Sequence, residues 1–208
     1  DKHIFQSKET VVLTSATLRT AGYGGTESTF NYLRERLHAH EADELAVGSP
    51  FDYKNSTLLY LVTDIPEPNQ PGYQRLLEQA IIDTAVTLGG RTLVLFTANN
   101  HLNQTATAID SQLARHNITT LAQGGGASRQ QLLEQFRREG GRNVLLGTRS
   151  FWEGVDVPGP ALTALLIAKL PFDVPTDPIF AARSETYENP FFEYSIPEAV
   201  LRFRQGFG

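Results

Sequence analysis

The sequence contains no cysteine and no methionine among its 208 residues. Without cysteine, this segment cannot form a disulfide or supply thiolate ligands to zinc or to an iron–sulfur cluster. It also has no apolar run near the roughly 20 residues that a membrane-spanning helix needs, and its first residues lack the apolar core of a signal peptide. We therefore expect a cytoplasmic protein that makes no contact with a membrane.

Positive charge is scarce as well. The chain has 18 Lys and Arg against 23 Asp and Glu, which gives a net charge of −5. This balance provides no general attraction for nucleic acid, so any DNA contact has to come from a local groove. With 40% hydrophobic residues, the chain can form one domain with a sizeable core. It starts at Asp1 and stops within the pattern LRFRQGFG, which predicts a piece of a longer protein.

Apolar runs and turn residues predict alternating strands and helices along the chain. Strands are expected at 10–13, 58–62, 91–97, 119–122, 143–147 and 164–170, and helices at 27–38, 73–88, 102–115, 129–138 and within 178–208. This alternation predicts an α/β domain with a mostly parallel sheet flanked by helices. Ligands of such sheets bind at the carboxyl ends of the strands. We expect one shared edge for the loops that follow Leu13, Phe96, Leu121 and Leu146.

The glycine-rich loop GTRSFWEGVDVPG, at 147–159, is the most informative segment and directly follows an apolar strand. Its glycines allow tight turns and the close approach of a ligand, and the hydroxyl groups of Thr148 and Ser150 suit a phosphate oxygen. Glu153 and Asp156 are acceptors suited to a ribose hydroxyl or to a cationic partner across a cleft. On spacing alone, an ordinary packed turn with exposed acids fits equally well.

The full string at 147–159 closely resembles motif V of DinG/XPD-type superfamily 2 DNA helicases. Four further segments resemble motifs of this family in the expected order: 11–18 (VVLTSATL, motif III), 93–97 (LVLFT, motif IV), 170–178 (LPFDVPTDP, the LPFxxPxxP segment) and 205–208 (QGFG, the start of motif VI). The resemblance covers almost the whole chain. It implies that residues 1–208 form the second RecA-like motor domain of such a helicase, a three-layer α/β domain, truncated within motif VI.

The resemblance also implies roles for individual residues. An ATP cleft is expected at Glu153, Gly154, Asp156, Gln205 and Gly206. Contacts with single-stranded DNA are expected at Thr97, Asn99, Thr148 and Ser150. Motif III, at Thr14, Ser15, Ala16 and Thr17, is expected to couple the two. The implied activity is ATP-driven translocation and unwinding of DNA with 5′ to 3′ polarity, in repair or replication.

Several parts of such an enzyme are absent from this sequence. It has no phosphate-binding loop of the form G-x-x-x-x-G-K-[ST], and Asp43-Glu44 lacks the apolar strand that should precede a Mg²⁺-positioning motif. The family arginines that reach the γ-phosphate fall beyond Gly208. The resemblance assigns ATP, Mg²⁺ and an iron–sulfur cluster mainly to the first RecA-like domain of the same chain. We expect the present segment to be inactive alone.

Some features allow two interpretations. Motif IV continues as Thr97-Ala98-Asn99-Asn100, where the family commonly has Ser after Thr. Thr97 and Asn99 can hold a DNA phosphate, or Asn99 or Asn100 can simply cap the next helix. Trp152 can stack on a base, although packing between sheet and helix is favoured. Packing is likewise favoured over DNA contact for the aromatic set at Phe180, Tyr187, Phe191, Phe192 and Tyr194.

A Ser-x-x-Glu pattern at Ser195 and Glu198 predicts a capping box that opens the final helix. The five histidines are scattered, and we expect no metal site among them. Two other functions fit the same motifs. One is a RecA-like module that binds nucleic acid or a partner protein without motor activity, and the other is the helicase part of an exonuclease–helicase fusion. A Walker lysine or nuclease carboxylates outside this segment would distinguish them.

Overall fold

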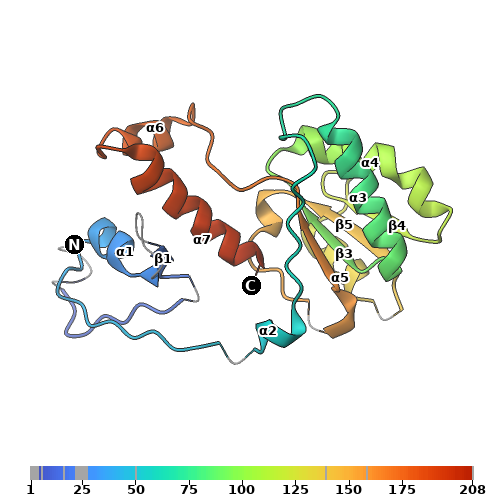
Figure 1. Cartoon of the computed structure of the whole chain (residues 1–208). Helices are drawn as coiled ribbons and strands as arrows, with labels where there is room; N and C mark the ends of the chain where they lie inside the picture. The colour runs from blue at the N-terminus through green and yellow to red at the C-terminus, as the bar shows by residue number, and fades with distance from the viewer. Residues whose placement is uncertain are drawn as a thin grey trace.

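A computed structural model describes residues 5, 7–15, 17–21, 28–49, 51–138, 140–157 and 159–207. These residues form a parallel sheet with helices on both faces and, beside it, a smaller helical region (Figure 1). Segments from both ends of the chain build the helical region, and its helix α7 runs back toward the sheet (Figure 1). The predicted α/β class, with a parallel sheet flanked by helices, is confirmed.

The sheet has the strand order β4-β5-β3-β6, and all three pairings are parallel. Its strands are β3 Thr92–Leu95, β4 Thr119–Ala122, β5 Asn143–Gly147 and β6 Ala164–Ile167. The covering helices are α3 Tyr73–Leu88, α4 Asn99–Ala114 and α5 Arg129–Arg137. Because every strand runs in the same direction, the loops that follow the strands lie along one edge of the sheet.

Alternate residues of β3 enter two different cores. Val94 packs with the buried side chains of α3 and α4, whereas Leu93 and Leu95 pack with those of α5. Residues on neighbouring positions of a strand point to opposite faces, so a strand covered on both sides must be apolar throughout. The three layers are therefore α3 and α4, the sheet, and α5.

Helix α3 agrees with the predicted range because the residues that end it lie next to it in the sequence. It spans the predicted residues 73–88 and ends where Gly89 adopts a left-handed backbone with φ of 68°. The N–H of Gly90 then donates to the carbonyl of Ala85 at 2.7 Å. Glycine reaches this conformation without a Cβ clash, so the Gly89-Gly90 pair stops the helix.

The helical region consists of α1 Asn31–Leu37, α6 Pro178–Ser184, the π-helical segment η3 Phe191–Ser195 and α7 Ile196–Phe207. Tyr32, Phe180 and Tyr194 form its buried core. A two-stranded antiparallel ribbon, β1 Thr20–Ala21 with β2 Ser28–Thr29, precedes α1, and the short helix α2 Tyr53–Ser56 lies in the connection to the sheet. Short 3₁₀ turns lie at η1 Arg149–Phe151 and η2 Gly159–Ala161. None of the helices in the described ranges has the length and apolarity to cross a membrane.

Two predicted strands are wrong. Residues 10–13 and 58–62 carry no strand, and their apolar side chains are largely exposed, with Leu58 at 89% and Val12 at 79%. Apolar, β-branched composition favours an extended chain, but a strand also needs a hydrogen-bonded neighbour, and no described segment pairs with either run. The loop after Leu13 is consequently not delivered by a strand of the sheet.

Several boundaries also differ from prediction: the strand expected at 91–97 is Thr92–Leu95, and the helix expected at 102–115 is Asn99–Ala114. The helix expected at 27–38 begins only at Asn31, because Ser28–Thr29 pair with β1, while Glu27 lies outside the described residues. The strand expected at 164–170 ends at Ile167, where its pairing with β3 ends.

The predicted capping box at Ser195 and Glu198 is wrong as well. Ser195 lies within continuous helical backbone, because η3 runs directly into α7. The Glu198 carboxylate instead accepts hydrogen bonds from Tyr32 and Arg36 of α1. A capping box does occur at Ser128 and Gln131, where α5 begins at the edge of the sheet at which the strands end.

Candidate functional site

The loop after β5 is held in place by an arginine that the sequence did not single out. Arg129, the first residue of α5, donates from Nε to the carbonyl of Ser150 at 2.8 Å and from Nη2 to those of Glu153 and Gly154 at 3.0 and 2.8 Å. Its guanidinium also lies over the ring of Phe151. Arg129 thus holds the 150–154 part of the loop that carries the motif V residues. The signal for Arg129 in the sequence is its position at the start of a predicted helix, just after a predicted strand.

Thr148 is buried and hydrogen-bonded to another part of the domain. It is 6% exposed, and both its backbone N–H and its hydroxyl contact the Gln123 side-chain oxygen, at 2.8 and 3.0 Å. This contact joins the loop after β5 to the residue that follows β4. The Thr148 hydroxyl is therefore already engaged, whereas Ser150 is exposed.

Trp152 connects three of the segments. Its ring is 4% exposed, and its indole Nε1 donates to the carbonyl of Phe96 at 3.0 Å. Gly206 lies against the Trp152 ring. A Cβ at position 206 would stand 2.6 Å from this ring and 3.2 Å from Leu95. The structure confirms that Trp152 packs in the interior and does not present a face for base stacking.

The end of α7 also contacts the motif III segment. The Gln205 amide lies 3.4 Å from the Thr17 hydroxyl, and Arg204 donates to the carbonyl of Arg19 at 2.6 Å. Ser15 and Thr17 are hydrogen-bonded to each other, and Ser15 is exposed. Thr14 is exposed too, while Ala16 lies outside the described residues. Segments III, IV, V and VI therefore meet through direct contacts.

Other predicted residues present open polar groups at this edge. The side chains of Thr97, Asn99 and Ser150 are exposed. Asn99 is the first residue of α4, and the cap position belongs to Ala98, which offers no side-chain hydrogen bond. The alternative that Asn99 or Asn100 caps this helix is therefore wrong.

The two predicted acids face outward from the loop. Glu153 and Asp156 are exposed, and within the described ranges their carboxylates have no hydrogen bond or ion pair. Their backbone carbonyls are held, that of Glu153 by Arg129 and that of Asp156 by Arg137. The loop conformation is thus fixed while both negative charges remain available to a partner.

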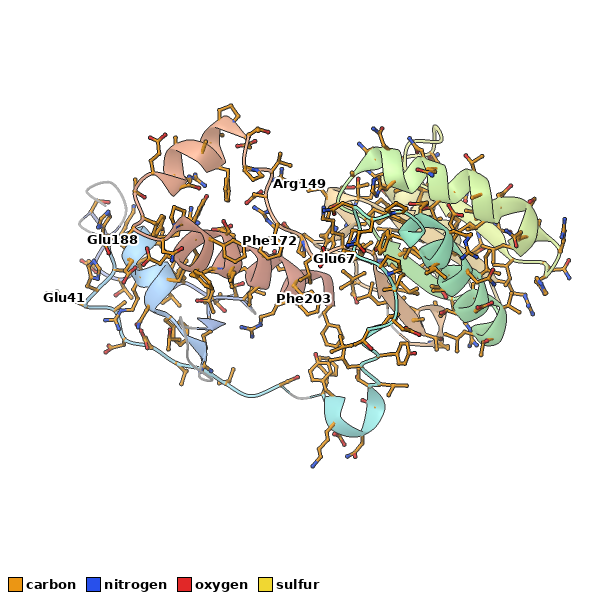
Figure 2. The ribbon with its side chains drawn as sticks, turned by 45° about the horizontal axis from the view of Figure 1, so that its top comes forward. Glu41, Glu67, Arg149, Phe172, Glu188 and Phe203 are labelled. Atoms are coloured by element: carbon orange, nitrogen blue, oxygen red, sulfur yellow. The ribbon has the colours of Figure 1, made fainter. Side chains whose placement is uncertain are left out.

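An open hollow of about 700 Å³ lies beside this loop and is lined by Arg129, Arg149, Ser150, Glu153 and Gly154. Arg149 stands on the side of the sheet region that faces the helical region (Figure 2). Because Arg129 is committed to backbone carbonyls, Arg149 supplies the accessible cation of the hollow. The combination of a guanidinium and an exposed hydroxyl suits a phosphate oxygen.

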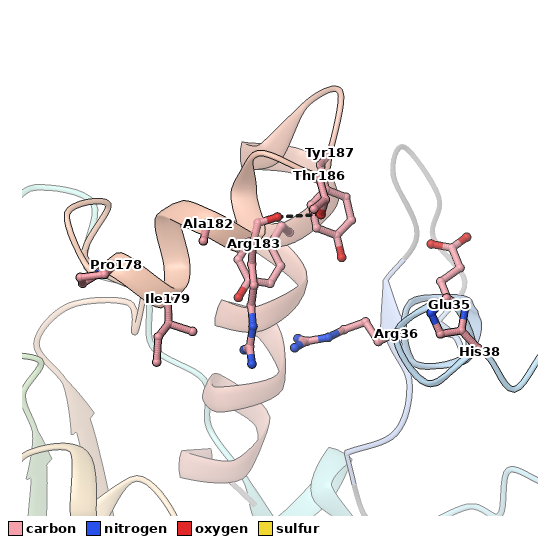
Figure 3. A pocket seen from close by; sticks show the side chains of 10 residues that line it. Glu35, Arg36, His38, Pro178, Ile179, Ala182, Arg183, Thr186 and Tyr187 are labelled. Carbon is pink, nitrogen blue, oxygen red and sulfur yellow. Dashed lines mark hydrogen bonds between the residues drawn. The ribbon is translucent and has the colours of Figure 1, made fainter. Parts of the chain in front are cut away.

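A second open hollow, of about 690 Å³, lies between α1 and α6. Arg36 projects toward it from α1 and Arg183 from α6 (Figure 3). Its wall also includes Glu35 and the stacked rings of Tyr187 and Tyr194, whose centroids are 5.4 Å apart. Throughout the described residues, no group of three or more His, Asp or Glu is arranged to hold a metal ion.

The aromatic set near the chain end divides into two groups. Phe180, Tyr187 and Tyr194 stack with one another in and around the core of the helical region, as the packing interpretation predicted. Phe191 and Phe192 are 52% and 41% exposed, and Phe191 stacks on Phe172 of the LPF segment. Phe191 and Phe192 are therefore not part of a buried core, and the packing interpretation is wrong for these two residues.

Comparison with known proteins gives consistent matches. The family model described as the helicase C-terminal domain matches residues 81–208. The chain is 35% identical over 201 residues to the ATP-dependent DNA helicase YoaA of Escherichia coli, a match that covers 95% of this chain and 30% of that protein. It is 36% identical over 214 residues to the 3'-5' exonuclease DinG of Bacillus subtilis, covering 98% of this chain and 22% of that protein.

The ATP-dependent helicase DinG of Mycobacterium tuberculosis is 35% identical over 209 residues, with 97% of this chain and 30% of the relative covered. The chain thus spans less than a third of the length of these relatives. The family match covers most of the chain, including β3, β5 and α7, which carry the contacts described above. The chain belongs to the helicase C-terminal domain family and is a DinG-type member of it.

Proposed function

We propose that the whole protein is an ATP-dependent DNA helicase and that this chain is its second RecA-like motor domain. The observation that carries the proposal is the contact series from Thr17 to Gln205 and from Gly206 through Trp152 to Phe96. A motor domain has to connect its nucleotide-facing and DNA-facing residues mechanically, and a packed series of this kind supplies such a connection.

The DNA-facing side of the proposed site is the edge formed by the loops after β3 and β5. Thr97, Asn99 and Ser150 present exposed polar groups there, and Arg149 adds a positive charge. We propose that these groups hold the phosphates of single-stranded DNA, because neutral donors and one guanidinium grip a backbone without reading bases. Thr148 supports this grip from within through Gln123.

The nucleotide-facing side comprises the end of α7 and the acidic part of the loop after β5. Gln205 and Gly206 are proposed to face ATP, while Glu153, Gly154 and Asp156 line the cleft toward the first motor domain. We propose that this first domain, in the same chain, binds ATP and Mg²⁺. An iron–sulfur cluster, where the whole protein carries one, is proposed to belong to this first domain too, as the resemblance to DinG/XPD-type helicases implies. Closure of the two domains on ATP would advance the DNA with 5′ to 3′ polarity, in repair or replication, and the present segment alone would be inactive.

The test uses the intact protein and measures its DNA-stimulated ATPase. Glu153→Ala combined with Asp156→Ala removes both free carboxylates, and we expect a loss of about ten-fold in kcat. A matched control replaces two exposed acids on the outer helices, Asp110→Ala with Glu134→Ala, and should retain full activity. Wild-type-like ATPase in the first double variant would overturn the assignment of this loop.

Two alternative functions give different outcomes in the same assays. An intact protein that binds single-stranded DNA but hydrolyses no ATP would be a binding module without motor activity. The Bacillus subtilis relative bears the name of a 3'-5' exonuclease, which favours a nuclease and helicase fusion as the second candidate. Degradation of a 3′-labelled strand by the intact protein without ATP would support that fusion.

A further inference from the structure

Helix α7 is held at both ends by contacts of different kinds. Its C-terminal end carries Gln205 and Gly206, which meet Thr17 and Trp152. Its N-terminal turn carries Glu198, eight residues before Gly206, which places the two about 12 Å apart along the helix axis. The contacts that fix the first turn of α7 therefore also set the position of Gln205 and Gly206, the residues proposed to face the nucleotide.

The carboxylate of Glu198 receives donors from two other places. The Tyr32 hydroxyl of α1 donates to Oε1 at 2.5 Å, and the Arg36 guanidinium donates to the same oxygen. Arg202, one turn further along α7, forms an ion pair with Oε2 at 3.7 Å. The side chain of Glu198 is only 17% exposed, so water does little to weaken these interactions.

The network extends to the segment after the sheet. Arg202 binds both carboxylate oxygens of Asp173 at 2.6 and 2.7 Å and lies 3.4 Å from the carbonyl of Pro171. The hydrogen bond with Asp173, with its charge, raises the pKa of Arg202. A paired guanidinium of this type is geometrically specific, because its fork fits the carboxylate plane.

On the other side, Arg36 reaches from α1 toward α7 (Figure 3). Its guanidinium lies over the rings of Tyr32 and Tyr194, at 5.5 and 5.6 Å from their centroids. The network therefore joins α1, which follows motif III, with α7, which ends in motif VI, and with the LPF segment that follows β6. No part of it belongs to the residues that the family motifs contain, apart from Pro171 and Asp173.

We propose that Glu198 is a positioning residue of the motor domain: by gathering Tyr32, Arg36 and Arg202, it fixes the orientation of α7 and so places Gln205 and Gly206. This inference rests on the proposed function for the meaning of Gln205, but the placement of α7 can be tested without ATP or DNA. Trp152 is the single tryptophan of the chain and packs against Gly206, so its fluorescence reports how the far end of α7 is seated.

The experiment compares the 208-residue chain with its Glu198→Gln variant, which keeps the side-chain shape and removes the charge. We expect the Trp152 emission to shift to longer wavelength and its acrylamide quenching constant to rise about two-fold, with an unchanged far-ultraviolet circular dichroism spectrum. Glu188→Gln is the matched control, because Glu188 is exposed and lies on the side of the helical region that faces away from the sheet (Figure 2). Identical Trp152 emission and quenching in wild type and Glu198→Gln would overturn the proposal.

A milder variant keeps the test decisive if Glu198→Gln does not fold. Tyr32→Phe removes one hydroxyl from the network, and a smaller rise in Trp152 quenching is expected. Arg36→Gln combined with Glu198→Gln should raise the Trp152 quenching constant by less than the sum of the two single changes, because the two residues share a contact. Additive effects of the two changes, or Tyr32→Phe behaving as wild type, would contradict the proposal.

In the intact protein, the same variants separate positioning from simple destabilisation. Misplacement of Gln205 should lower kcat for ATP about ten-fold at saturating ATP and leave the KM within about two-fold. An equal loss of folded protein and of kcat would overturn the positioning role. Intact wild-type protein without ATPase would refute the proposed function instead, while the Trp152 result would stand.

Discussion

The backbone of Gly206 lies directly against the indole ring of Trp152, so close that a Cβ at position 206 would stand 2.6 Å from the ring carbon Cε3. Trp152 is buried, and its Nε1 donates to the carbonyl of Phe96. This contact brings the end of α7 onto the loop after β5. It requires glycine at position 206 for lack of space, not for backbone conformation.

The first prediction follows from this contact. In an exposed helix, Gly→Ala stabilises by roughly 0.8 to 1.0 kcal/mol. For Gly206→Ala we expect the opposite sign, because the new methyl group collides with the Trp152 ring and displaces α7. Urea unfolding followed by circular dichroism measures the free energy, and Trp152 fluorescence should shift in the folded baseline. Gly48→Ala is the control, since no atom lies within 4 Å of a Cβ there. A more stable Gly206→Ala chain with unchanged fluorescence would disprove this interpretation.

The second prediction concerns the support of the loop after β5. Arg129→Ala removes donors from three backbone carbonyls, those of Ser150, Glu153 and Gly154. We expect a loss of about 1 kcal/mol in stability, because these bonds are partly open to water. Amide exchange within 149–154 should also become faster. Arg115→Ala, at an exposed arginine after α4, should change neither quantity. Unaltered exchange in Arg129→Ala would show that the loop is fixed by other contacts.

The third prediction concerns the hollow beside this loop and depends on the proposed DNA contact. If Arg149 neutralises one phosphate, Arg149→Ala should reduce the slope of log Kobs against log salt by about 0.7 for single-stranded DNA. The measurement is fluorescence anisotropy of a labelled oligonucleotide with the intact protein at several salt concentrations. Arg75→Ala on α3 is the matched control, and its slope should equal that of wild type. An unchanged slope in Arg149→Ala would remove this arginine from the DNA contact.

The fourth prediction concerns stability at high pH. Burial raises the pKa of Tyr32 above its ordinary value of 10.0, and the hydrogen bond with Glu198 adds to the effect. The unfolded chain therefore loses this proton at a lower pH than the folded one, so the contribution is complete below pH 10 and falls as pH rises further. Urea titrations at several pH values should show the free energy of unfolding declining above about pH 10.

The Tyr32→Phe chain should show a weaker decline, because one of the shifted tyrosines is gone. Burial also raises the pKa of Tyr73 and of Tyr187, so part of the slope should remain. Tyr60→Phe serves as the control, since the Tyr60 side chain is 76% exposed. An identical slope in wild type and Tyr32→Phe would contradict the role given to the Glu198 contact.

Local patterns predicted well those elements whose stability is also local or whose apolar face is continuous. The residues of α3, β4 and β5 agree with prediction because periodicity, glycine stops and short apolar runs lie within each segment. The same patterns failed at 58–62, where an apolar run has no strand beside it, and at Ser195, where a capping pattern lies inside a continuous helix. Both failures depend on the tertiary environment of the segment, which its own sequence does not show.

The sequence by itself determined the family, through motif strings in a fixed order, and the parallel α/β class, through the alternation of apolar strands and helices. Only the tertiary structure decided which side chains hold the site together. Tyr32 and Glu198 are 166 positions apart, and Trp152 meets Phe96 across 56 positions. Side-chain contacts over such separations depend on how elements pack, and no pattern within either segment encodes the partner.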